Sequence, residues 1–184
     1  MRSTRVARRY AQALMSAAEE RNTLETITVD LQRIAGIIRS SREFRAFLGS
    51  PVVSIPRKNS VLKELFGTAV GPETFAFLTL LVVKQREGQL AEIIEQFHAL
   101  HDAKMGIANV DVTTAVELTA QQHTALQKEL EQRTGKSVRL RVVVDSAIRG
   151  GLVVRIGDTV LDASLTRQLE RLRERFARGA ELPH

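Results

Sequence analysis

Two histidines and an aspartate stand close together in the chain and could bind a metal ion. His98, His101 and Asp102 fall on adjacent turns of a predicted helix, and imidazole nitrogens with a carboxylate oxygen are common zinc ligands. Two histidines without a third strong ligand at a recognised spacing do not complete a four-coordinate site. The spacing therefore indicates a solvated helix face, and we predict no metal site.

A second motif has the ending of a phosphate-binding loop. Residues 134–137 read Thr-Gly-Lys-Ser. The full motif requires another glycine five residues before Gly135, and the chain has Leu130 there. We interpret Gly135 as the residue that ends a helix, and we predict no nucleotide cofactor.

The other reactive side chains also lack a catalytic arrangement. The chain has no cysteine, which excludes disulfides, thiolate metal sites and cysteine nucleophiles. No serine lies in a Gly-x-Ser-x-Gly turn. Asp145, Asp158 and Asp162 are expected near turns, where aspartate usually shapes the turn or caps a helix. The sequence therefore predicts a protein that is not an enzyme and needs no cofactor.

Charge is the next indicator of function. The net charge is +6, spread over both halves, which favours an acidic partner without selecting nucleic acid. On the last predicted helix, Arg167, Arg171 and Arg175 recur every four residues. This stripe could meet acidic side chains of a partner, although a solvated face is the alternative.

The longest apolar run, residues 75–83, is about half as long as a membrane span.

Six amphipathic helices are predicted before residue 106, and they would position any binding surface. The first spans about residues 4–21. Capping-box spacing at Asn22 and Glu25, and again at Ser40 and Glu43, predicts the next two helix starts. The later boundaries come from first-turn prolines and terminal glycines: Pro56, Pro72, Gly88 and Gly106.

The first and fifth of these helices differ from the others. Residues 75–83 are apolar around nearly the whole circumference, so this helix is either central or partly covered by another protein. The first helix presents mainly alanines together with Tyr10 and Leu14. Small side chains allow close approach, so the two helices together could form a groove for an amphipathic helix.

The second half has the period-two alternation of strands. Strands are expected around residues 108–116, 138–144, 152–156 and 159–161, with a helix from the Thr119–Gln122 capping pair to Gly135. A final helix starts near Leu165. The predicted fold is mainly α: an N-terminal six-helix bundle over residues 1–105, followed by a small α+β domain over residues 106–184.

Three motifs, in order along the chain, carry a family resemblance. Residues 7–14 read Ala-Arg-Arg-Tyr-Ala-Gln-Ala-Leu, and residues 86–90 read Arg-Glu-Gly-Gln-Leu, followed by Phe97. Residues 144–158 read Val-Asp-Ser-Ala-Ile-Arg-Gly-Gly-Leu-Val-Val-Arg-Ile-Gly-Asp, and residues 162–164 read Asp-Ala-Ser. Together they resemble the delta subunit of F-type ATP synthases, the counterpart of the mitochondrial oligomycin-sensitivity-conferring protein. Ala163 departs from the pattern, because glycine is more frequent there.

The resemblance implies a stator role in the peripheral stalk, as one copy in a hetero-oligomer that resists rotary torque. The N-terminal domain would bind N-terminal segments of the alpha subunits between the first and fifth helices. The residues expected in that groove are Tyr10, Ala13, Leu14, Thr79, Val82 and Val83. The C-terminal domain would bind the C-terminal ends of the b-type subunits, with Arg167, Arg171 and Arg175 as candidates. The expected location is peripheral, on the cytoplasmic face of a bacterial cell membrane or the equivalent side of an organellar membrane.

A basic RNA-binding or assembly protein is the alternative hypothesis. No aromatic stacking platform accompanies the arginines, so we expect no nucleic-acid partner. Nucleic-acid affinity would fall steeply with salt concentration, which distinguishes the two hypotheses.

Overall fold

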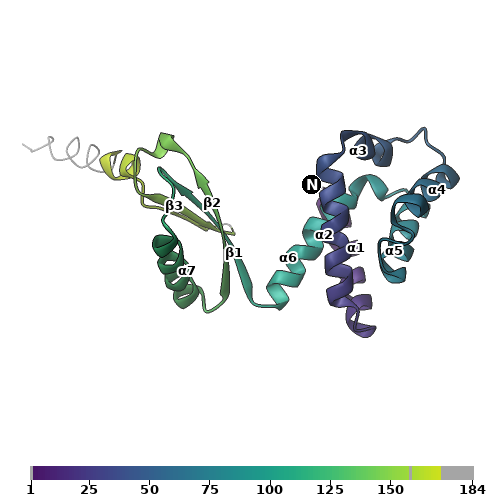
Figure 1. The fold of residues 1–184 in the computed structure, drawn as a ribbon, viewed down its shortest axis with the longest axis horizontal. Helices are drawn as coiled ribbons and strands as arrows, with labels where there is room; N and C mark the ends of the chain where they lie inside the picture. The colour runs from purple at the N-terminus through teal and green to yellow at the C-terminus, as the bar shows by residue number, and fades with distance from the viewer. Residues whose placement is uncertain (1, 158, 171–184) are drawn as a thin grey trace, which may run out of the picture. The chain divides into compact units, whose positions relative to one another are not determined.

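The computed structural model describes residues 2–157 and 159–170 (Figure 1). The chain divides into two compact units between His101 and Asp102. The described part of the first unit is helical, and that of the second contains a four-stranded sheet. The predicted fold class, a six-helix N-terminal part followed by a small α+β part, is confirmed.

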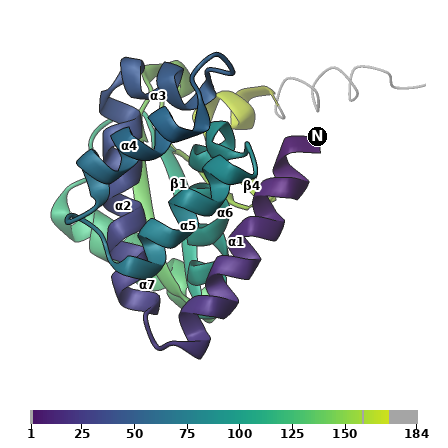
Figure 2. The same ribbon diagram turned by 90° about the vertical axis from the view of Figure 1, so that its right-hand side faces the viewer.

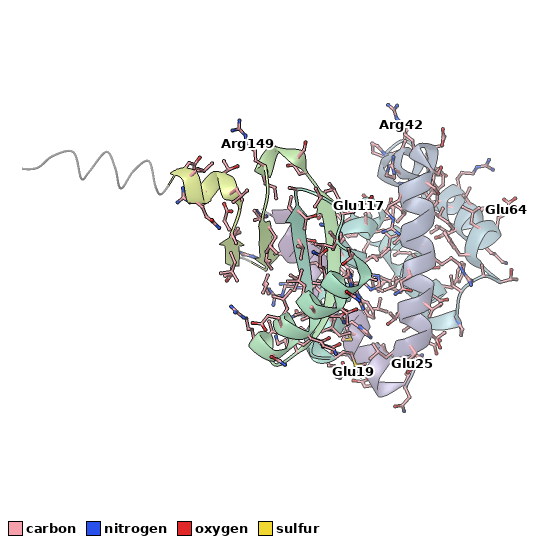
Figure 3. All side chains as sticks on the ribbon, turned by 60° about the vertical axis from the view of Figure 1, so that its left-hand side comes forward. Glu19, Glu25, Arg42, Glu64, Glu117 and Arg149 are labelled. Atoms are coloured by element: carbon pink, nitrogen blue, oxygen red, sulfur yellow. The ribbon has the colours of Figure 1, made fainter. Side chains whose placement is uncertain are left out.

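The first unit has one continuous hydrophobic core. Its helices are α1 (Arg2–Glu20), α2 (Leu24–Ser40), α3 (Arg42–Gly49), α4 (Ile55–Phe66), α5 (Pro72–Val83) and α6 (Leu90–Lys104), with a short 3₁₀ turn, η1 (Glu87–Gln89), before α6. Every helix contributes buried apolar side chains to the core. Charged side chains such as Arg42 and Glu64 point outward (Figure 3).

Capping residues and prolines in the sequence predicted most helix ends, but three predicted ends need correction. Pro56 and Pro72 lie in the first turns of α4 and α5 as predicted. The predicted start at Asn22 is wrong, because Asn22 takes a left-handed conformation (φ 55°) in the connection and α2 begins at Leu24. The cap of α3 is one residue later than predicted, since the Ser41 hydroxyl accepts from Phe44 N. Helix α5 ends at Val83 rather than Gly88, since Gln85 is left-handed (φ 54°).

The second unit packs one helix on a mixed sheet with strand order β2-β1-β3-β4. The strands are β1 (Ile107–Thr114), β2 (Ser137–Val144), β3 (Leu152–Ile156) and β4 (Thr159–Asp162). Strand β1 pairs parallel with β2 and antiparallel with β3. Helix α7 (Ala120–Thr134) makes the crossover, and its predicted capping box between Thr119 and Gln122 is confirmed. Its Leu130 packs into the core over the inner face of the sheet.

Two consecutive glycines allow close packing after the turn η2 (Ser146–Ile148). Gly151 has φ +76°, and a Cβ there would lie 2.3 Å from the carbonyl oxygen of Ala163. At Gly150 a Cβ would lie 2.5 Å from Leu165 Cδ1. Residues 150–152 therefore lie directly against residues 163–165, where a helix begins that is described to residue 170. Among the described residues, no helix is both long enough and apolar enough to cross a membrane.

Candidate partner-binding surface

Helix α5 has an apolar outer face. Phe77, Leu78 and Leu81 are buried, whereas Leu80 is 44% exposed and Val83 is 54% exposed. We call the outward residues the α5 row: Ala76, Thr79, Leu80 and Val83. The Thr79 hydroxyl donates to the carbonyl oxygen of Phe75 at 3.0 Å. Its hydrogen is therefore already bonded within the helix and needs no acceptor from a docked helix. Of the two predicted explanations for this apolar helix, burial on all sides within this unit is wrong, because Leu80 and Val83 are exposed.

Helix α1 carries a second row of small and apolar side chains at helical spacing. Ala7, Ala11 and Ala18 are fully buried, and the next positions around the helix are partly or fully exposed. The α1 row consists of Val6, Tyr10, Ala13 and Ala17. In Figure 2, α1 runs along the right of the helical unit, with α5 and α6 to its left. The exposed Arg9 lies beside this row, three residues after Val6 and four before Ala13 on the helix, so an acidic residue on a docked segment is complementary to it.

The structure divides the six predicted groove residues into two sets. Tyr10, Ala13, Thr79 and Val83 are at least partly exposed and belong to the two rows. Leu14 and Val82 are buried in the core, where they support the rows from below and cannot touch a docked helix. Four members of the two rows were not among the six predicted residues: Val6, Ala17, Ala76 and Leu80. The four-residue spacing of Val6 from Tyr10 and of Ala17 from Ala13 was a usable signal.

A buried carboxylate fixes the N-terminal end of α5. Asp30 of α2 is 5% exposed, and its Oδ2 accepts hydrogen bonds from Gly71 N at 2.8 Å and Thr74 Oγ1 at 2.7 Å. Gly71 is the N-cap residue of α5 and has no side chain to cap it. Asp30 therefore acts as a cap from another helix, and it sets the position of the α5 row relative to α2.

A buried ion pair lies in the connection that follows α5. Lys58 Nζ lies 2.5 Å from Glu87 Oε1 and donates to the carbonyl oxygen of Leu48 at 3.2 Å. The two charged side chains are 4% and 9% exposed. The Arg-Glu-Gly motif at residues 86–88 thus joins η1 to α4 and to the end of α3.

Four of the residues first considered for chemistry have structural roles: Asp102, Gly135, Asp145 and Asp162. Asp158 lies outside the described residues. Asp102 accepts hydrogen bonds from Asn109 Nδ2 and Arg139 Nη1. Gly135 ends α7 in a left-handed conformation (φ 64°), as predicted. Asp145 and Asp162 accept from backbone amides two residues ahead, so they shape turns as expected. Within the described ranges, no group of three or more potential ligands could hold a metal ion.

The second unit has an open apolar groove beside α7. Its volume is about 530 Å³, and it lies between α7 and the strands β3 and β4. Apolar side chains from both sides line it, among them Leu126, Leu152, Val160 and Leu161. Val160 and Leu161 are about half exposed. This groove is the size of a small-molecule or side-chain binding site.

The predicted arginine stripe is described only at its first member. Arg167 Nη1 lies 3.2 Å from Glu170 Oε2, three residues ahead on the same exposed helix. Arg171 and Arg175 lie outside the described residues. An exposed pair of this kind contributes at most about 1 kcal/mol to stability, so little stability depends on Arg167 staying paired with Glu170.

Comparisons with known proteins agree with the sequence motifs over nearly the full length. The family model for the ATP synthase delta (OSCP) subunit matches residues 6–176. "ATP synthase subunit delta" of Chlorobium phaeovibrioides is 43% identical, covering 96% of this chain and 97% of its own length. The Chlorobaculum tepidum protein of the same name is 40% identical, covering 94% and 96%. A chain in the cryo-EM structure of the Toxoplasma gondii mitochondrial ATP synthase hexamer superposes with a TM-score of 0.74 at 30% identity, covering 97% of this chain and 98% of that one.

Proposed function

This chain belongs to the ATP synthase delta (OSCP) subunit family, and from that premise we propose how its two units connect the parts of the enzyme. As a family member it is a non-catalytic component of the peripheral stalk of F-type ATP synthase. We propose that the N-terminal domain predicted over residues 1–105 binds the catalytic head, and that the C-terminal domain predicted over residues 106–184 binds the b-type stalk subunits.

The outward apolar face of α5 carries the proposal for the N-terminal unit. The N-terminal segment of an alpha subunit binds as an amphipathic helix between the α1 row and the α5 row. Tyr10 and Val83 contact its apolar side, and Arg9 meets an acidic residue on its flank. A guest helix that buries about four leucine-sized side chains gains roughly 6–12 kcal/mol before association costs of similar size. Several such contacts are therefore needed to hold the head.

A peptide-binding experiment tests this surface. The probe is a synthetic peptide of the alpha-subunit N-terminus from the same enzyme, titrated calorimetrically into the full chain. Leu80→Asp and Val83→Asp each place a charge in the α5 row and should abolish measurable binding. Val29→Asp is the matched control, because Val29 is 55% exposed on α2 and belongs to neither row. Unchanged affinity in Leu80→Asp would rule out this surface.

For the C-terminal unit, we propose that the groove beside α7 holds the C-terminal ends of the b-type subunits. Support comes from its half-exposed lining, Val160 and Leu161, and from Arg167 on the helix after β4. Leu161→Asp should abolish capture of a peptide that spans the C-terminal end of a b-type stalk protein, while leaving the alpha-peptide affinity unchanged. Equal capture by the variant would contradict the assignment.

The proposed stator is one copy in a hetero-oligomer. It attaches peripherally to the cytoplasmic face of a bacterial cell membrane, or to the equivalent side of an organellar one. The alternative of a basic RNA-binding or assembly protein has no support in the family assignment. An alpha-peptide affinity that changes only a few-fold between 50 and 200 mM salt would distinguish the stator from a nucleic-acid binder, whose affinity falls by orders of magnitude.

A further inference from the structure

Strand β2 forms an edge of the sheet in the second unit. Among the described residues, β1 is the only strand that pairs with it. Two hydrogen bonds at the ends of this pair fix the orientation of the β2 backbone: Ser137 N donates to the carbonyl oxygen of Gly106, and Asp145 N donates to that of Thr114. In a parallel pair, the N–H and C=O of one residue point to the same side, and successive residues alternate. The odd-numbered residues of β2 therefore face β1, and the even-numbered residues face outward.

Helix α7 already covers the first outward position. The Gln127 amide donates to the carbonyl oxygen of Val138 at 3.1 Å, and Val138 N donates to Glu131 Oε1 at 3.1 Å. These two side chains satisfy both backbone groups of Val138, as a paired strand would. They also confirm independently that the even-numbered residues face away from β1.

The other outward positions have no such cover. Their backbone N–H and C=O groups have no hydrogen-bond partner within residues 2–157 and 159–170. An open hollow of about 340 Å³ runs beside residues 137–140, and the side chains of Val143 and Val144 are 51% and 49% exposed. The edge is therefore accessible along its length, and it can accept another strand. The open outward positions are Leu140, Val142 and Val144.

The side chains of β2 determine which strand fits. On the face opposite α7, Arg139 and Arg141 follow this edge, and their side chains are 61% and 77% exposed. Arg141 uses its Nε to bind Asp111 on the β1 side, at 2.7 Å, which leaves its terminal nitrogens for a carboxylate on the open side. Acidic side chains on an added strand are complementary to these arginines.

The same arginines disfavour a second copy of this chain. Two β2 strands paired through their middles would bring arginines of both copies together on one face, and like charges at cross-strand positions repel. The residues that alternate with the arginines are apolar, from Val138 to Val144. A matching strand is therefore acidic on one face and apolar on the other.

We infer that the outer edge of β2, over residues 140–144, binds an extended segment of another protein in which acidic and apolar residues alternate. Backbone hydrogen bonds supply the affinity, and the arginines select the acidic segment. This site is distinct from the groove proposed above for the b-type subunits, because that groove lies at β3 and β4, at the other end of the strand order. Failure of one assignment therefore leaves the other intact.

The test uses the full chain and a synthetic eight-residue peptide, as long as β2, in which glutamate and valine alternate. Binding is measured by the fluorescence anisotropy of the labelled peptide. A matched peptide with lysine in place of glutamate should bind at least about tenfold more weakly. No binding of the glutamate peptide, or equal binding of the two peptides, would overturn the inference.

N-methylated peptides distinguish strand addition from adsorption by charge alone. One derivative is methylated at the valine nitrogens and the other at the glutamate nitrogens, so both keep their charge and lose N–H donors. An antiparallel added strand directs its valine amides toward β2, and a parallel one directs its glutamate amides there. One derivative should therefore lose binding while the other keeps it, and unchanged binding of both would overturn the inference.

Protein variants locate the site. Val142→Pro removes an outward N–H and keeps the bonds to β1, so it should weaken the glutamate peptide about tenfold. Arg141→Glu should weaken the glutamate peptide by a similar factor and strengthen binding of the lysine peptide. Arg155→Glu is the matched control, because Arg155 is exposed on β3 and, like Arg141, lies opposite Asp111.

Two results with these variants would overturn the inference. The first is an equal effect of Arg141→Glu and Arg155→Glu on the glutamate peptide, since binding would then follow net charge rather than the edge. The second is a concentration-dependent dimer in analytical ultracentrifugation that Val142→Pro abolishes, since a second copy would then occupy the edge. Hydrogen exchange in β1 and β3 verifies that each variant keeps the sheet.

Discussion

Replacing Lys58 with methionine should destabilise the helical unit more than any surface substitution on α4. The change keeps the length of the side chain but leaves the Glu87 carboxylate buried without its cation. Breaking a buried pair from one side costs about 3–5 kcal/mol. Since single domains are stable by about 5–15 kcal/mol, the variant should lose a large part of its total stability.

The companion variants isolate the ion pair from packing. Glu87→Met should cost about the same as Lys58→Met, because it leaves the ammonium group buried. The double variant replaces the pair with two apolar side chains, which is often close to neutral, so it should be more stable than either single variant. Lys63→Met, at an exposed position on α4, should change stability by about 0.5 kcal/mol or less.

Hydrogen exchange read by mass spectrometry is the appropriate assay, because a chain with two compact units need not unfold in one step. Peptides from α4 report the opening free energy of the helical unit alone. A cost below about 1 kcal/mol for Lys58→Met, or a double-variant cost equal to the sum of the two single costs, would refute the buried-pair explanation.

Three further outcomes are expected. Asp30→Ala should destabilise the helical unit by about 2–4 kcal/mol, since it removes the cap of α5 and leaves the Thr74 hydroxyl without its acceptor; Asp30→Asn, which keeps an acceptor oxygen, should lose less by the same exchange assay. Gly151→Ala should destabilise the sheet unit by more than about 2 kcal/mol, because of the positive φ and the carbonyl contact at Ala163; wild-type protection of β3 would contradict this. Hydrogen bonds from its own backbone amide and then from the Ser41 hydroxyl lower the pKa of Glu43. Its stabilising effect is therefore present above the unfolded-state pKa and lost as the pH falls through the folded-state pKa, so acid titration of Glu43→Gln should show a smaller loss of α3 protection.

Periodicity predicted the elements well where local patterns decide them. The strand over residues 152–156 matches β3, and the Thr119 capping box opens α7. Helix ends failed where a backbone conformation decided them. Asn22 and Gln85 take left-handed conformations, and the sequence offers no unambiguous mark for this in a residue other than glycine.

The binding surface was predictable as a pair of helices but not residue by residue. When a helix is apolar on all sides, the sequence pattern does not show which side faces the core. The sequence therefore could not separate buried Val82 from exposed Val83. The supporting contacts were not predictable at all. Asp30 reaches Thr74 across 44 positions, and Lys58 reaches Glu87 across 29. Such pairs depend on how the helices pack.

The mixed sheet also affects how the chain folds during synthesis. Strand β1 is central, yet both strands that pair with it lie later in the sequence. Its antiparallel neighbour β3 begins about 40 residues after β1 ends, which at 5–20 residues per second leaves one edge of β1 open for roughly 2–8 s on the ribosome. The helical unit is complete before β1 emerges. Asp111, a charge in the middle of β1, discourages pairing of that open edge with other nascent chains.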